Sequence, residues 1–186
     1  MIARVALVLG AFVGGAVSGV AAQSLRAGVL GSPAIGKAAP PLELPYVTAD
    51  GPGPADQPFR LGAELGRVVI LVFGGGNDST RVAGWRQAAA AVTPMLGRSV
   101  VAAGVVRGSV AEVTDFATKI GGSLKLAADA EGRGARAWGI GDAARYWTAF
   151  VVGDDGRVVW SGRIDPARPG DWDLVGAAVR RGRTIP

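Results

Sequence analysis

The feature that most constrains the fold is an uninterrupted apolar run from Val68 to Phe73. A strand with this pattern is buried on both faces, so it belongs at the centre of a sheet that helices cover on both sides. The run ends at Gly74-Gly75-Gly76, and residues 77–80 (Asn-Asp-Ser-Thr) offer side chains that cap a helix extending to about Leu96. The sequence therefore predicts a β-loop-α unit.

The same alternation continues towards the C-terminus. The apolar patterning predicts strands at 99–106 and 124–128, helices at 109–120 and 131–138, a hairpin of strands at 148–152 and 157–161, and a last helix at 171–181. The turn Asp154-Asp155-Gly156 supports the hairpin, and the alternating units favour parallel pairing before it. We expect an α/β domain with a central mixed sheet flanked by helices.

The N-terminus carries an uncharged apolar segment from Val5 to Ala22, preceded by Arg4. Two interpretations remain open: a single transmembrane helix, or a signal peptide cleaved near Ala22. Small-xxx-small spacings allow close packing against another membrane helix and favour retention. The residues that form these spacings are Gly10, Gly14, Gly15, Ser18 and Gly19. A retained helix predicts a single-pass protein of the bacterial inner membrane with its C-terminal domain in the periplasm.

The sequence then divides into a membrane or signal segment at 1–24, a Pro/Gly-rich tether at 25–58 and a folded domain at 59–186. Within the tether, Leu42 to Val47 is a candidate for a short edge strand.

Composition excludes several kinds of chemistry. The chain has no cysteine and no histidine, so it lacks a thiolate nucleophile, an imidazole base and Cys/His metal ligands. We expect no cofactor and no metal. The net charge is +5, and the positive residues gather only at Arg180, Arg181 and Arg183, a basic tail that is solvated or meets acidic lipid or protein. Basic residues are not interleaved with aromatics, so nucleic acid is not an expected partner.

Four local motifs carry a family resemblance. They are Gly36 to Leu44 (G-K-A-A-P-P-L-E-L), Leu61 to Phe73, Leu126 to Asp129, and Phe150 to Val158 (F-V-V-G-D-D-G-R-V). In this order they resemble the thioredoxin-like superfamily, in particular its peroxiredoxin branch (AhpC/TSA, redoxin). The resemblance implies a thioredoxin-like fold.

The catalytic positions of that family are not kept. The resemblance places its T-x-x-C motif at Thr80 to Ala83, where alanine stands in place of the reactive cysteine. A thiolate at the start of a helix is normally stabilised by backbone N–H groups and the helix dipole. Trp147 occupies the position of the cis-proline or arginine that the family places before the hairpin. The resemblance therefore implies a degenerate domain without thiol activity.

The remaining candidates are one loop, two sets of aspartate residues and the aromatic residues. Gly74 to Asn77 leads into a helix N-terminus and resembles an anion site physically, although its spacing fits no phosphate-binding motif. Asp154 and Asp155 fit ordinary turn chemistry, as do Asp165, Asp171 and Asp173, which sit in turns or at helix starts. We expect Trp85 and Trp138 in the core, and Tyr146 and Trp147 at an interface.

These observations favour a non-catalytic, membrane-anchored subunit with a structural or docking role in a larger membrane complex. A bacterial photosynthetic or respiratory assembly is one candidate host, and its subunits and the lipid bilayer are the expected partners. The alternatives are an exported soluble binding module, or a small-anion binder using residues 74–80 with Ser79, Thr80 and Arg81.

Overall fold

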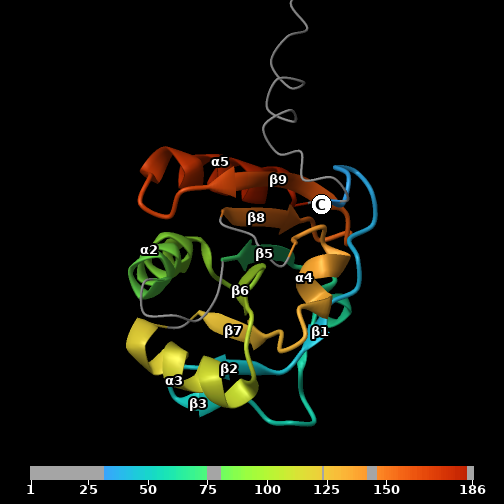
Figure 1. Ribbon diagram of the computed structural model, residues 1–186. Coiled ribbons are helices and arrows are strands. Elements are labelled where there is room, and N and C mark those ends of the chain that lie inside the picture. Colours follow the sequence, from blue (N-terminus) through green and yellow to red (C-terminus); the bar gives the residue numbers. More distant parts are fainter. Residues whose placement is uncertain (1–31, 75–80, 123, 142–145, 184–186) are drawn as a thin grey trace, which may run out of the picture.

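The computed structural model describes residues 32–74, 81–122, 124–141 and 146–183. Within these residues the chain forms a seven-stranded sheet of order β3-β2-β7-β6-β5-β8-β9 and a two-stranded sheet β1-β4 (Figure 1). The elements in chain order are β1 (Glu43–Leu44), β2 (Tyr46–Thr48), β3 (Gly51–Pro52), β4 (Phe59–Arg60), η1 (Leu61–Glu64), β5 (Val68–Phe73), α2 (Val82–Val92), η3 (Thr93–Met95), β6 (Val100–Val106), α3 (Val110–Ile120), β7 (Lys125–Ala128), α4 (Arg133–Ala137), β8 (Trp147–Val152), β9 (Val158–Ile164) and α5 (Pro169–Arg181).

The sheet is mixed, as the sequence predicted. β5 pairs in parallel with β6, and β6 in parallel with β7, whereas β8 is antiparallel to both β5 and β9. β5 is flanked by strands on both sides and every residue in it is buried, which explains its unbroken apolar pattern. β5 is therefore an interior strand of the sheet, between β6 and β8.

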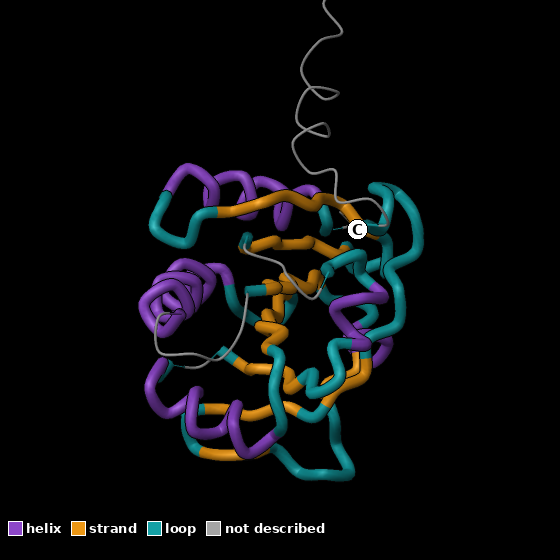
Figure 2. The backbone as a smooth tube through the Cα atoms, viewed as in Figure 1, coloured by secondary structure: helices purple, strands orange, loops and turns teal. Residues whose placement is uncertain are grey.

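Alternate residues of β5 supply two separate cores. Val68, Ile70 and Val72 lie in the larger core, together with buried residues of α2, α3 and α5. Val69, Leu71 and Phe73 lie in the core on the opposite face, with residues of β1, β4 and η1. Figure 1 shows α2 to the left of the central strands β5 and β6, α4 to their right and α3 at the lower left, and Figure 2 shows the same arrangement in the backbone.

The tether that the sequence placed at 25–58 differs from the structure in its second half. β2 lies between β3 and β7, pairing Val47 with Leu126, and Val47 is fully buried. The packed domain thus begins well before residue 59. Prolines at 40, 41 and 45 limit β1 and β2 to two and three residues. Strands this short do not produce a recognisable alternating pattern in the sequence.

Helix ends follow local chemistry. Ser109 and Glu112 form a reciprocal capping box at the start of α3. The backbone N–H and the hydroxyl of Ser109 both donate hydrogen bonds to the Glu112 carboxylate. These bonds lower the pKa of the carboxylate, and the backbone N–H has the larger effect. The helix predicted to reach Leu96 ends as α2 at Val92 and continues as η3, whose first turn holds Pro94.

Among the residues that the structure describes, no helix has the length and apolar character needed to cross a bilayer. The predicted membrane segment, including Gly10, Gly14, Gly15, Ser18 and Gly19, lies outside the described residues.

Candidate functional site

The degenerate catalytic positions meet where β5 ends and α2 begins. In the antiparallel β5–β8 pair, Phe73 lies opposite Thr148, so Trp147 at the start of β8 falls beside Gly74. Ala83 and Gly84 are in the first turn of α2. The structure therefore brings together the strand end, the helix start and Trp147.

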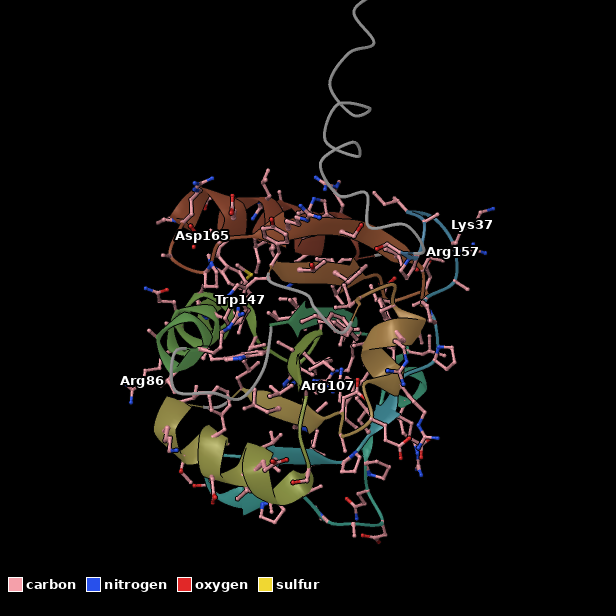
Figure 3. All side chains as sticks on the ribbon, viewed as in Figure 1. Lys37, Arg86, Arg107, Trp147, Arg157 and Asp165 are labelled. Atoms are coloured by element: carbon pink, nitrogen blue, oxygen red, sulfur yellow. The ribbon has the colours of Figure 1, made fainter. Side chains whose placement is uncertain are left out.

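The indole of Trp147 fills the space between these elements. It is 9% exposed and packs edge-on against the fully buried Trp85, with ring centroids 4.8 Å apart and an interplanar angle of 65°. Figure 3 shows Trp147 beside α2. The vacated site is thus occupied by a side chain of the protein itself.

Two glycines make room for this indole. A Cβ atom built on Gly74 would lie 2.6 Å from Cε3 of Trp147 and 2.8 Å from Cζ2 of Trp85. A Cβ atom built on Gly84 would lie 2.6 Å from Cζ2 of Trp147. Gly84 was not identified from the sequence as part of the site. A glycine inside a predicted helix could have indicated close packing of another side chain against that position.

Ala83 is exposed and carries no ionisable or nucleophilic group. Thr80, the motif position that is retained, lies outside the described residues, as do residues 75–79 of the predicted anion-binding loop. Arg81 immediately precedes α2 and is partly buried. The site therefore offers packing rather than thiol chemistry at the position where the family resemblance places its cysteine.

Tyr146 and Trp147 differ sharply in exposure. Tyr146 is 57% exposed, and the guanidinium carbon of Arg163 lies 4.3 Å from its ring centroid. Trp147 is packed in the core, so Tyr146 is the member of the predicted interface pair that presents a large side chain to solvent.

The prediction that Trp85 and Trp138 are core residues is confirmed, since both are fully buried. Trp138 packs on the second face of the sheet against Phe73 and Phe150, with ring centroids 5.9 and 4.9 Å away. Within the described part of the chain, the indole nitrogens of Trp85 and Trp138 find no hydrogen-bond partner.

The carboxylates act as local structural groups. Asp129 is 2% exposed, and its carboxylate accepts hydrogen bonds from the backbone N–H of Gly134 at 3.1 Å and of Ala135 at 2.8 Å. Asp155 accepts from the backbone N–H of Arg157 at 3.0 Å within the hairpin turn. Asp129 thus secures α4, and Asp155 has the turn role expected from the sequence.

Two further predicted carboxylates, Asp165 and Asp171, behave in the same way. Asp165 accepts a hydrogen bond from the N–H of Ala167, and Asp171 accepts one from the N–H of Asp165. No group of three carboxylates positioned to hold a metal ion occurs in the part of the chain that the structure describes.

Solved structures of two kinds share this fold. A thiol:disulfide interchange protein DsbE from Chlorobium tepidum, described as putative, superposes with a TM-score of 0.63 at 18% identity, covering 81% of this chain and 99% of that one. The reduced 2-Cys peroxiredoxin of Plasmodium vivax gives a TM-score of 0.64 at 16% identity, covering 78% and 80%. The bacterioferritin comigratory protein of Xanthomonas campestris gives 0.58 at 23% identity, covering 74% and 90%.

A search of the curated proteins found no match. The sequence model of the AhpC/TSA family matches residues 35–161, which include Gly74, Gly84 and Trp147 of the indole-filled site and the hairpin as far as Ser161. This match covers more than half of the chain, and the chain has no cysteine, which fits the loss of thiol peroxidase activity. The chain belongs to the AhpC/TSA family as a thioredoxin-like domain that lacks the catalytic cysteine.

Proposed function

We propose that this protein is a non-catalytic docking subunit, held at the bacterial inner membrane by its N-terminal segment, whose thioredoxin-like domain lies in the periplasm. The observation that carries the proposal is the indole of Trp147, which packs against Trp85 and between two glycines where the active site of the family would open. A fold retained with a filled site supports a role that depends on surfaces.

The chemistry of the site supports the same conclusion. A cysteine peroxidase or disulfide oxidoreductase needs a thiolate, and a helix start and nearby cations stabilise that charge. Ala83 supplies no thiol, and the indole of Trp147 supplies only an N–H donor within an apolar surface. The first turn of α2 also contains no acidic residue that could act as a general base.

The exposed pair of Tyr146 and Arg163 is the proposed contact with partner subunits. A tyrosine stacked on a guanidinium presents a large, ordered surface with a polar tip, and both residue types are frequent at the centres of protein interfaces. The pair lies beside Trp147, at the end of the sheet where active members of the fold would expose their thiol.

The proposal is tested by purification of the full chain from its own membranes in mild detergent, followed by intact mass spectrometry of the chain and of all co-purifying proteins. We expect the full-length chain together with membrane protein subunits in a fixed ratio. Recovery of a chain that starts near Gln23, alone in the soluble fraction, would contradict the proposal and favour an exported binding module.

The docking surface is tested with Tyr146→Ala in the same experiment. This variant should reduce the recovered partner at least several-fold, because it removes the exposed ring that Arg163 stacks on. Leu174→Ala is the matched control, since Leu174 is also a large exposed apolar residue, on α5, and its loss should leave recovery unchanged. Equal recovery with both variants would exclude Tyr146 from the interface.

The enzymatic alternative is tested with Ala83→Cys, which returns a thiol to the family position in a chain without other cysteines. We expect its reaction with hydrogen peroxide to be no faster than that of a free cysteine. Rapid peroxide reduction would show that the site retains catalytic capacity.

A further inference from the structure

Three segments converge at the end of β5 opposite to Trp147. The backbone N–H of Gly36 donates to the carbonyl of Val158 at 2.7 Å, and Nη1 of Arg157 donates to the carbonyl of Gly36 at 2.9 Å. The backbone N–H of Asp154 donates to the carbonyl of Gly182 at 3.0 Å, just beyond α5. The first described part of the chain, the β8–β9 turn and the C-terminus of α5 therefore form one surface.

This surface combines cationic and apolar side chains. We call it the hairpin patch, and it consists of Ile35, Lys37, Leu65, Arg157, Arg181 and Arg183, all of which are exposed. Ile35 and the three arginines line a hollow of about 300 Å³. Leu65 lies over Gly156 and is 63% exposed, and Ile35 is 51% exposed.

The charge of the hairpin patch is positive. Its four cations face two carboxylates of the turn, Asp154 and Asp155, which leaves a formal excess of two positive charges. Asp155 lies 3.7 Å from Nε of Arg157, and Asp154 also has an interaction partner. Arg181 complements the dipole of α5, but this role does not account for Lys37 or Arg157.

Exposed aliphatic residues among cations suit the boundary between anionic headgroups and acyl chains. The patch is also close to the predicted membrane segment, because the 13 residues that follow Ala22 up to and including Ile35 can span at most about 45 Å. We propose that the hairpin patch docks on the anionic lipid surface of the membrane; this inference rests on the membrane attachment in the proposed function.

Docking through the hairpin patch would set the orientation of the domain. β5 separates the patch from Trp147 by about 20 Å, the length of a six-residue strand. Figure 3 shows Lys37 and Arg157 together on one side of the molecule, away from Trp147, Arg86 and Asp165. The Tyr146 surface would then face away from the lipid, where it is open to extramembrane parts of a partner.

The absence of native cysteine allows a direct test by single-site labelling. Ala38→Cys labels an exposed position next to Lys37 and paired with Arg157 of the patch, and Ala83→Cys labels an exposed position at the opposite end of β5. The full-length variants, each with an environment-sensitive fluorophore, are reconstituted into phosphatidylcholine vesicles with and without about one third phosphatidylglycerol, together with a lipid that carries a headgroup quencher.

We expect the label at position 38 to be quenched several-fold more than the label at position 83, and only when phosphatidylglycerol is present. Replacement of Lys37, Arg181 and Arg183 by glutamine should lower this quenching at least fivefold, since one cation near an anionic surface changes partitioning about fivefold. The matched control replaces Arg86, Arg133 and Arg168 by glutamine, which removes the same charge from exposed positions outside both the hairpin patch and the pair of Tyr146 and Arg163 and should leave the quenching unchanged.

Three outcomes would overturn the inference. Vesicle flotation of the chain with equal quenching at both positions would leave the anchor intact but exclude patch docking. Failure of the chain to float would instead refute the membrane attachment itself. Protection of the label at position 38 in native membranes but not in pure lipid vesicles would assign the patch to an acidic protein surface.

Discussion

Gly84 provides the most direct test of the indole-filled site. Gly84→Ala should destabilise the protein even though alanine is the better helix former, because the new methyl group meets Cζ2 of Trp147 at 2.6 Å. Overpacking of this kind costs about 1–3 kcal/mol, and alanine returns up to about 1 kcal/mol of helix propensity. We therefore expect a net loss of roughly 1–2 kcal/mol in the free energy of unfolding.

Two further variants separate the contact from general effects. Gly176→Ala is the matched control, because a Cβ at this position of α5 meets only Met95 Cε at 3.7 Å and Arg180 Nη1 at 3.8 Å, so alanine should stabilise by up to about 1 kcal/mol. In a Trp147→Phe background, which removes the outer ring of the indole, Gly84→Ala should also become stabilising. The coupling between positions 84 and 147 should then be about 1–3 kcal/mol.

The assay is equilibrium unfolding by urea of the full chain in mild detergent, followed by far-UV circular dichroism because tryptophan fluorescence changes with the substitution itself. A change in midpoint at constant slope measures the change in stability. If Gly84→Ala is as stabilising as Gly176→Ala, the indole does not lie against α2 and the account of the filled site is refuted.

Three other predictions concern the core, a buried carboxylate and a helix cap. Gly104→Ala should destabilise by about 1–3 kcal/mol, because its Cβ would lie 2.8 Å from Cη2 of Trp85 and 2.9 Å from Cδ2 of Leu126; an unchanged thermal midpoint would contradict this. Asp129→Ala should cost about 2 kcal/mol in urea unfolding through loss of two hydrogen bonds to α4, whereas exposed Asp173→Ala should have little effect. Because the pKa of Glu112 is lowered, its ionised form stabilises the fold at a pH above the ordinary pKa of 4.5, and this contribution is lost as the pH falls through the lowered pKa. The difference in unfolding free energy between wild type and Glu112→Gln should therefore shrink in acid. A difference that does not depend on pH would show that the capping box does not hold the carboxylate.

Much of the architecture could be predicted from the sequence because local patterns carry it. The unbroken run of β5, the capping box of α3 and the Asp-Asp-Gly turn each specify their element through nearby residues, and the structure contains all of them. The short strands at 43–52 could not be delimited in this way. β2 is stabilised by pairing with β7, a contact between segments about 80 residues apart, whereas β1 pairs with β4 and β3 with β2.

The sequence by itself determined the mixed α/β fold, the loss of the catalytic cysteine and the burial of Trp85 and Trp138, because residue identity and local periodicity suffice for these. Only the tertiary structure decided what became of the vacated site. Trp147 lies more than 60 residues from Gly84 in the chain, and its exposure depends on β8 lying beside β5 and on the room that two glycines leave. Tyr146 and Trp147 are adjacent and similar in size, yet strand geometry turns one into the core and leaves the other in solvent, since successive side chains point to opposite directions at the start of a strand.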